Sequence, residues 1–278
     1  MLSTSLADLH QNGAVLLPGF FSRDQVLALK NGIDYDNSLE SPFKAHINKA
    51  MGSGMTTNIW RTSDVKQFAD FCTSSELINL MNKIFYPKPF RFLQDTWFLR
   101  PNDCTVSIPW HHDNIVVGDH YSVWVSLTEH KLEDSLCFVA GSHNDGFSYM
   151  PLSYFVDKQD DDSDIDKYYR NYNMASTLQL KETFVPIPSD EELIKSRHIL
   201  SWPTSPGDCI IFNSRTLHSL PSGCGDYERI GFVSRWIADG STIALHAEDT
   251  VKAIQNAGLS ISLSVGDPIC GDQFPLYK

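Results

Sequence analysis

Three side chains that suit one metal ion lie in two short stretches of the chain. His111 and Asp113 are separated by one residue, and His218 follows far downstream, with Arg229 eleven residues beyond it. In an extended strand, residues i and i+2 point to the same side, so His111 and Asp113 can reach one ion together while His112 points away. Two imidazoles and one carboxylate that leave the opposite face of the metal open are the ligand set of non-haem Fe(II) oxygenases. The spacing therefore predicts a catalytic iron site at His111, Asp113 and His218.

The types of these ligands favour a catalytic metal over a structural one. Imidazole and carboxylate suit a borderline divalent metal, and no thiolate pair lies near them in the sequence. Three protein ligands do not complete the coordination sphere. Arg229 offers a planar guanidinium that pairs with a carboxylate through two hydrogen bonds. We expect its partner to be the far carboxylate of 2-oxoglutarate, whose other end binds the metal.

Strands preceded by helices are the elements that must position these residues. Caps and apolar spacing predict helices over residues 2–11, 22–32, 64–72 and 75–85, with an apolar strand at 13–21. From residue 90 on, short aromatic and β-branched runs predict strands over 90–100, 108–113, 121–128, 136–139, 208–212 and 229–238. Helices followed by a run of strands indicate a mainly β fold with flanking helices, a double-stranded β-helix of the jelly-roll, cupin-like kind.

The domain organisation expected from this pattern is a single domain over residues 1–278. Helices at about 1–85 should pack on a jelly roll at about 90–240, with an insertion at about 150–195 between the two ligand segments. Residues 157–166 read DKQDDDSDID, an acidic and apolar-poor stretch. Its position suits a lid over the site, and a solvated loop without a role is the alternative.

Composition restricts the partners and the compartment. The net charge of −12 disfavours nucleic acid and anionic membranes as partners. The six cysteines contain no CxxC pair, and no apolar run approaches the length of a membrane span, which predicts reduced thiols in a cytoplasmic protein. We expect a small-molecule substrate and a monomer or homodimer.

Further stretches surround the ligands in a fixed order along the chain. They are NIWR at 58–61, WHHD at 110–113, SVWVSL at 122–127, AGSH at 140–143, LSW at 200–202 and PGD at 206–208. Together with His218 and Arg229, they resemble the phytanoyl-CoA dioxygenase (PhyH) family of Fe(II)/2-oxoglutarate-dependent oxygenases, over roughly residues 13–243.

The resemblance implies roles for individual residues. His111, Asp113 and His218 would bind Fe(II), Arg229 would anchor 2-oxoglutarate, and Trp124 and Thr96 would line the co-substrate pocket. The expected enzyme is a dioxygenase that uses O₂, hydroxylates its substrate and releases succinate and CO₂.

The chain also departs from the family pattern. His112 stands where Gln or Asn is common, Ala140 replaces a proline, and Leu220 stands where phytanoyl-CoA dioxygenases can place a hydroxyl. The last difference, together with the missing peroxisomal tripeptide, argues against a phytanoyl-CoA substrate.

The substrate side is predicted from strand parity and residue type. Arg235 shares the parity of Arg229, so it is expected to face the interior and meet an anionic group, with an ion pair to one of the many acids as the alternative. Asn58 and Tyr121 are further candidate substrate contacts. These residues fit a small anionic or zwitterionic metabolite, such as an amino-acid derivative, an aminophosphonate or a natural-product intermediate. His130 is expected at the surface.

The same residues could also serve other functions. The same site could carry out desaturation, cyclisation or demethylation, because the fate of a substrate radical depends on its pose. A cupin-like protein that binds metal and 2-oxoglutarate without turnover is the non-enzymatic alternative, and the complete ligand set with Arg229 argues against it. A zinc hydrolase would need a general base near the ligands, and the sequence offers none. Asp113 argues against a halogenase, which vacates the carboxylate position.

Overall fold

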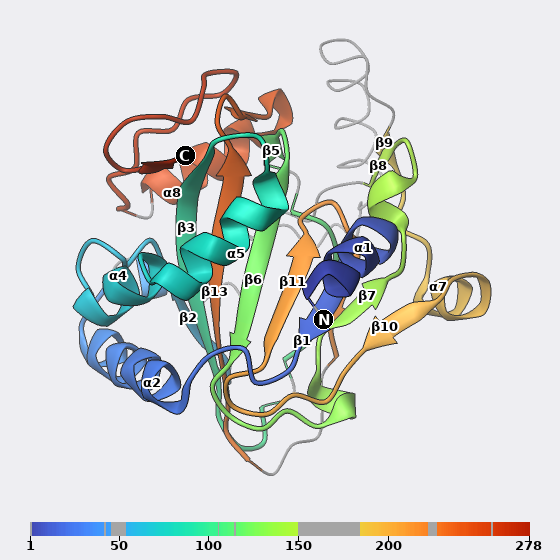
Figure 1. Ribbon diagram of the computed structural model, residues 1–278, viewed down its shortest axis with the longest axis horizontal. Coiled ribbons are helices and arrows are strands. Elements are labelled where there is room, and N and C mark those ends of the chain that lie inside the picture. The colour runs from blue at the N-terminus through green and yellow to red at the C-terminus, as the bar shows by residue number, and fades with distance from the viewer. Residues whose placement is uncertain are drawn as a thin grey trace, which may run out of the picture.

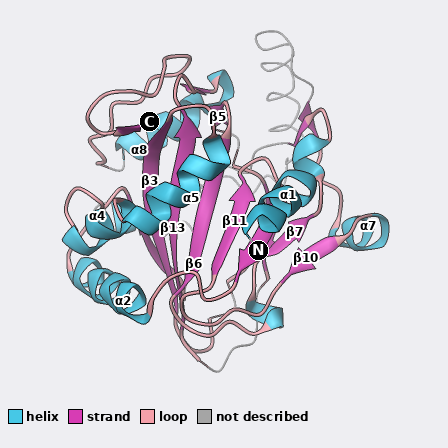
Figure 2. Ribbon diagram, viewed as in Figure 1, coloured by secondary structure: helices cyan, strands magenta, loops and turns pink. Residues whose placement is uncertain are grey.

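Two antiparallel sheets form the centre of the computed structural model, and helices cover the outer face of the larger sheet (Figures 1 and 2). The structure describes residues 2–41, 43–45, 54–104, 106–113, 115–149, 184–221, 227–256 and 258–278. This arrangement confirms the predicted mainly β fold with flanking helices, a double-stranded β-helix. Among these residues, no helix is long and apolar enough to cross a membrane.

The two sheets contain the strands that carry the candidate site. The larger has the order β1 (Ala14–Leu17), β11 (Cys209–Asn213), β6 (His120–Ser126), β13 (Arg229–Ala238), β3 (Phe90–Arg100) and β15 (Leu276–Tyr277), and β2 (Thr56–Ile59) also pairs with β3. The smaller has the order β10 (Ile199–Ser201), β7 (Cys137–Val139), β12 (His218–Leu220) and β4 (Ile108–His111). Two short pairs complete the described strands, namely β5 (Val116–Val117) with β14 (Thr242–Ile243) and β8 (Ser148–Tyr149) with β9 (Phe184–Val185).

The four predicted helices begin close to where the sequence places them, and the helices at 190–196 and 248–256 are not among the predictions. They are α1 (Leu2–Asn12), α2 (Arg23–Ser38), α4 (Lys66–Cys72), α5 (Ser75–Phe85), α7 (Asp190–Ser196) and α8 (Glu248–Asn256), with 3₁₀ turns η1 (Leu132–Asp134), η2 (Ser142–Asn144) and η3 (Leu245–Ala247). Ser22 caps α2 in a capping box with Gln25. The predicted end of this helix near Gly32 is wrong. A Cβ at Gly32 would lie 2.7 Å from the ring of Phe68, so this glycine permits close packing of α2 on α4 and does not end the helix.

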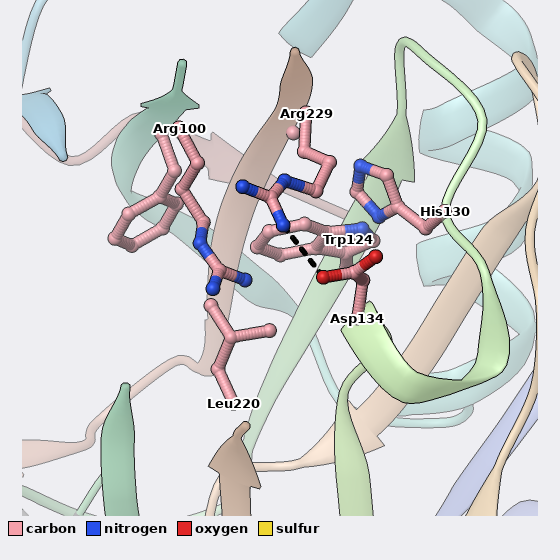
Figure 3. Close-up of a pocket in the computed structure, with 8 residues that line it drawn as sticks. Arg100, Trp124, His130, Asp134, Leu220 and Arg229 are labelled. Atoms are coloured by element: carbon pink, nitrogen blue, oxygen red, sulfur yellow. Dashed lines mark hydrogen bonds and ion pairs between the residues drawn. The ribbon is translucent and has the colours of Figure 1, made fainter. Parts of the chain in front are cut away.

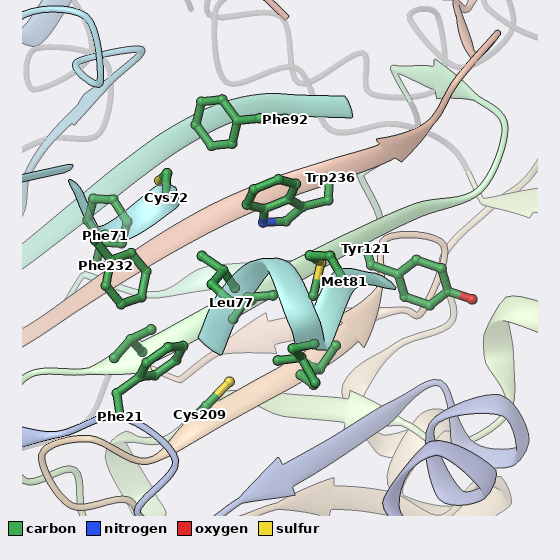
Figure 4. Packing of buried hydrophobic residues seen from close by; sticks show 14 of the residues in the cluster. Phe21, Phe71, Cys72, Leu77, Met81, Phe92, Tyr121, Cys209, Phe232 and Trp236 are labelled. Atoms are coloured by element: carbon green, nitrogen blue, oxygen red, sulfur yellow. The ribbon is translucent and has the colours of Figure 1, made fainter. Parts of the chain in front are cut away.

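Alternation along the strands of the larger sheet separates a helix-facing core from an inner face. Tyr121, Val123 and Val125 of β6 belong to the cluster that packs under the helices, whereas Trp124 belongs to the cluster between the sheets. Figure 4 shows Leu77 and Met81 of α5 packed over the strands of this helix-facing core. The inner face is therefore the one that can meet the smaller sheet and its histidines.

The insertion predicted at 150–195 is described only in part. Residues 184–195 contain β9 and most of α7, whereas the acidic stretch 157–166 lies outside the described residues.

Candidate metal centre and co-substrate cavity

The structure brings His111, Asp113 and His218 together, as the spacing predicts. One ligand atom from each residue lies within 4.8 Å of the others. Strand pairing explains why, because His111 of β4 is the register partner of His218 of β12, and their rings are 4.2 Å apart. The β4 strand ends at His111, and Asp113 is held just beyond it by a 2.8 Å hydrogen bond from its backbone N–H to the carbonyl of Ser214.

Both imidazoles are oriented for metal binding. Nδ1 of His111 lies 2.8 Å from the carbonyl of Pro109, and Nδ1 of His218 lies 2.8 Å from the carbonyl of Thr216. A carbonyl oxygen only accepts, so Nδ1 carries the proton in each ring and Nε2 presents its lone pair. A ligand histidine that donates its other N–H to a backbone carbonyl is the usual arrangement around a protein-bound metal. The donor set therefore fits a divalent metal such as iron.

The electrostatics of the three residues keep the donors deprotonated. Burial and the neighbouring His111 lower the pKa of His218 to about 3, and burial also lowers the pKa of His111. Burial by itself would raise the pKa of Asp113, but Arg235 and the two histidines more than offset this effect, so its pKa lies below the usual range. A metal would therefore displace no proton from these groups at neutral pH.

Arg235 lies on the inner face, next to the metal ligands. Its Nε donates to Oδ2 of Asp113 at 3.2 Å, and its Nη1 donates to the hydroxyl of Thr96 at 2.8 Å. Thr96 also accepts from the side chain of Gln94 at 3.1 Å. Arg235 therefore faces the interior, as its parity predicts, and it forms the alternative ion pair with an acid, here Asp113, so its contact with a substrate stays a prediction.

Two further histidines flank this centre in different ways. His112 points away from the ligands, and its Nε2 lies 2.8 Å from the carbonyl of Tyr149. His120 is buried on β6, and neither of its ring nitrogens has a hydrogen-bond partner. Burial lowers the pKa of His120 to about 4, and its charge would interact with Asp113 and Arg235. Sequence reasoning did not select His120, although its parity with Trp124 places it on the inner face.

Arg229 lines a cavity at the other end of β13. Its Nη1 donates to Oδ1 of Asp134 at 2.6 Å, and both side chains are 1% exposed. Figure 3 shows Arg100 and His130 gathered with this pair around Trp124. The complete lining consists of Phe98, Arg100, Trp124, His130, Asp134, Leu220, Arg229 and Gly231. Arg100 and Arg229 bring two guanidinium groups to this lining, and Asp134 brings one carboxylate.

The cavity adjoins the metal centre through β12. Leu220 lines the cavity and His218 is a candidate ligand, and these residues are two positions apart on one strand. Alternate residues of a strand lie roughly 6–7 Å apart on the same face. The cavity and the candidate metal centre are therefore neighbours along β12.

Trp124 fits the cavity because residue 231 has no side chain. A Cβ at Gly231 would lie 2.1 Å from Cζ2 of the Trp124 indole. The indole stacks on Phe98 with ring centroids 5.7 Å apart. Trp124 is therefore a wall of the cavity, and Gly231 is the residue that admits it, whereas contact of Trp124 with a co-substrate stays a prediction.

Several predictions about individual side chains are wrong. Asn58 does not face the substrate side, because its amide donates to Asp36 of α2 at 2.9 Å inside the helix-facing core. Tyr121 also faces the helices, where its ring meets Phe85 edge-on at 5.4 Å. His130 is buried rather than at the surface, because its backbone pairs with Thr204 and its ring packs edge-on against Trp124. Thr96 is on the inner face but beside Arg235 rather than in the Arg229 cavity, so its contact with a co-substrate stays a prediction.

Fold and site together define the class of protein. A jelly roll with a His-Asp-His group on its inner side, next to an arginine-lined cavity, is the architecture of Fe(II)/2-oxoglutarate-dependent oxygenases. The sequence profile of the family described as phytanoyl-CoA dioxygenase (PhyH) matches residues 9–219. The chain belongs to the PhyH family. It is an oxidoreductase of the Fe(II)/2-oxoglutarate-dependent kind, and iron and 2-oxoglutarate are its cofactor and co-substrate.

Solved structures share the fold at low sequence identity. The epimerase SnoN, in complex with Fe³⁺, α-ketoglutarate and nogalamycin RO, is 19% identical with a TM-score of 0.71, and the match covers 99% of this chain and 98% of SnoN. The carbocyclase SnoK from nogalamycin biosynthesis is 14% identical with a TM-score of 0.68, covering 99% and 96%. EctD from S. alaskensis, with 2-oxoglutarate and 5-hydroxyectoine, is 15% identical with a TM-score of 0.62, covering 87% and 77%. A search of curated protein sequences found no match.

Proposed function

We propose that the protein is a dioxygenase that hydroxylates a small anionic or zwitterionic metabolite. The observation that carries the proposal is the His111–Asp113–His218 group beside the Arg229 cavity, on the inner side of one jelly roll. The chemistry that iron, 2-oxoglutarate and O₂ supply is oxidative decarboxylation of 2-oxoglutarate, coupled to oxidation of the substrate, with release of succinate and CO₂. The chain contributes the ligands, the co-substrate anchor and the placement of the substrate.

The metal ligands act as a preorganised set in this proposal. The backbone carbonyls of Pro109 and Thr216 fix the two imidazoles with Nε2 toward the ion, so little side-chain ordering accompanies metal binding. Arg235 holds one oxygen of Asp113 and leaves the other for the metal. Arg229 anchors the far carboxylate of 2-oxoglutarate in the cavity, with Trp124 as a wall.

The substrate class rests on the inner wall next to the metal centre. Arg235 uses Nε and Nη1 for Asp113 and Thr96, and no hydrogen bond of its Nη2 is described. The Arg235 side chain is 16% exposed, so Nη2 is available to an anionic group of the substrate. His120 adds two ring nitrogens without partners on the same face. A small molecule with a carboxylate or phosphonate and a further polar group fits this wall.

The test measures metal binding and turnover separately. His111→Ala and His218→Ala should each abolish binding of Mn(II) or Co(II) and release of succinate, while the thermal unfolding transition remains. His198→Ala is the matched control, because His198 is exposed and outside the site. Either ligand variant that binds metal like the wild type would overturn the ligand assignment.

The same site could also oxidise its substrate without hydroxylating it. The fold is shared with an epimerase and a carbocyclase, so it does not by itself specify hydroxylation. A screen of anionic and zwitterionic metabolites, read by succinate release and followed by mass analysis, distinguishes the outcomes. A gain of one oxygen supports hydroxylation, whereas a loss of two hydrogens supports desaturation or cyclisation. Absence of any succinate release, with metal and 2-oxoglutarate bound, would favour the non-enzymatic binding protein.

A further inference from the structure

Thr96 accepts two hydrogen bonds on the inner wall next to the metal centre. Nη1 of Arg235 donates to its hydroxyl oxygen at 2.8 Å, and Nε2 of Gln94 donates to the same oxygen at 3.1 Å. A hydroxyl oxygen has two lone pairs and one proton. Both lone pairs of Thr96 are therefore used within the chain, and its hydroxyl can enter a further hydrogen bond only as the donor.

The Thr96 proton has no acceptor among the residues that the structure describes. The hydroxyl takes part in the two bonds above and in no other described one, although Thr96 is only 4% exposed. Nη2 of Arg235 likewise has no described acceptor, since this guanidinium donates from Nε and Nη1. A buried donor without an acceptor is costly, and a guest that accepts from it removes that cost.

Strand pairing places these two donors side by side. Arg235 of β13 pairs with Gln94 of β3, and Val233 pairs with Thr96, so Thr96 and Arg235 are diagonal neighbours on the inner face. Nε of Arg235 lies 3.2 Å from Oδ2 of Asp113, so the donor pair adjoins the candidate metal centre. The Arg235 side chain is 16% exposed, so a small molecule can reach this part of the wall.

His120 lies on the next strand of the same face and differs in its hydrogen-bonding chemistry. It pairs with Ile237, two residues from Arg235, and neither of its ring nitrogens has a partner within the described residues. Burial lowers its pKa to about 4, so the ring is neutral and carries one donor and one acceptor. Such a ring can meet a hydroxyl, an amine or an anion. Thr96 and Arg235 offer donors alone, so they are the part of the wall that distinguishes an anion from other polar groups.

We propose that Thr96 is a specificity-determining residue for the substrate, which acts with Nη2 of Arg235 to bind a carboxylate or phosphonate. An oxyanion has acceptor atoms for both donors, whereas an ammonium has no acceptor and a primary amide has one acceptor atom and no charge. This inference rests on the proposed function, in which the far carboxylate of 2-oxoglutarate lies at Arg229 and leaves the Thr96 wall to the substrate.

The test titrates acetate, methylphosphonate and acetamide into protein loaded with Mn(II) and 2-oxoglutarate. Binding beside the metal is read from the paramagnetic relaxation that Mn(II) imposes on the methyl protons of each probe. The wild type should bind at least one of the two oxyanions, the tighter one defining the headgroup, and should not bind acetamide. Thr96→Val keeps the size of the side chain and removes the hydroxyl. We expect it to raise the Kd of the oxyanion about tenfold or more, as for the loss of one hydrogen bond to a charged group, and Thr96→Ser to restore binding.

A second readout separates recognition of the anion from placement of Arg235. Because Arg235 also holds Asp113, a Thr96 variant that displaced Arg235 would weaken Mn(II) binding as well. We expect Thr96→Val to keep the wild-type Kd values for Mn(II) and for 2-oxoglutarate. Thr73→Val, at an exposed threonine that follows α4, is the matched control and should bind every probe like the wild type.

Several results would overturn the proposal. They are unchanged oxyanion binding in Thr96→Val, an equal loss of oxyanion and Mn(II) binding, and weaker binding of 2-oxoglutarate, which would assign Thr96 to the co-substrate. If Thr96→Val does not fold, Thr96→Ala replaces it under the same criteria. A wild type that binds Mn(II) and 2-oxoglutarate but neither oxyanion would overturn this inference alone, whereas a wild type that fails to bind Mn(II) and 2-oxoglutarate would overturn the proposed function with it.

Discussion

Replacing Gly231 by alanine should close the co-substrate cavity without removing any charge. The added methyl group would meet the Trp124 indole at 2.1, 2.5 and 2.7 Å, where ordinary contacts are 3.4–4 Å. The indole must therefore shift by about 1.3 Å. The indole also stacks on Phe98, which lines the same cavity, so we expect the shift to reduce the space beside Arg229. Such overpacking costs about 1–3 kcal/mol of the free energy of unfolding.

The assay compares two substitutions in the same strand. Gly231→Ala should raise the Kd for 2-oxoglutarate at least tenfold, measured by calorimetry on nickel-loaded protein. Ile230→Val, whose side chain packs under the helices, should cost a similar 0.5–1.5 kcal/mol of stability and leave the Kd unchanged. Urea unfolding of both variants measures how much free energy of unfolding each substitution costs. If Gly231→Ala binds 2-oxoglutarate like the wild type, the cavity beside Trp124 is not the co-substrate site.

Three further predictions concern the framework and the metal. Asp36→Ala should lower the free energy of unfolding by about 3–5 kcal/mol in urea, because this buried carboxylate accepts hydrogen bonds from three other elements; a loss under 1 kcal/mol would contradict this. Burial lowers the pKa of His120 and of His130 to about 4, so unfolding takes up protons. The stability of the metal-free protein should therefore fall as the pH drops from about 6.5 toward 4, by up to about 3 kcal/mol per ring, and a pH-independent urea midpoint would refute the assignment. Arg235→Gln should weaken Mn(II) binding about 10–100-fold by releasing Asp113, whereas an unchanged Kd would limit Arg235 to the substrate side.

The sequence alone was sufficient for the longer strands, for the four helices before residue 86 and for the candidate ligand set. Local signals determine these features, since the period-2 pattern and aromatic content of residues 90–100 and 229–238 match β3 and β13. The limits of α5 likewise agree with the predicted residues 75–85. His111 and Asp113 could be paired because strand parity is a property of the chain itself. His218 could be added because its residue type completes a known ligand set.

The inner and outer faces were decided only by the tertiary structure. Strand parity predicts that Tyr121 and Trp124 lie on opposite faces of the sheet, but it does not predict which face the helices cover. The packing of α5 shows that the face with Tyr121 is the covered one. Asn58 was misplaced for the same reason, since its partner Asp36 comes from a distant helix.

The lining of the Arg229 cavity depends most clearly on the tertiary fold. Arg100 ends β3, and His130 and Asp134 lie around η1, so both segments are far from Arg229 in the sequence and neither has a local signal that links it to Arg229. Their meeting depends on the pairing of β13 with β3 and β6 and on the ion pair between Arg229 and Asp134 of η1. Long-range strand pairing and burial determine which polar groups remain without partners, and these quantities exist only once the chain is folded.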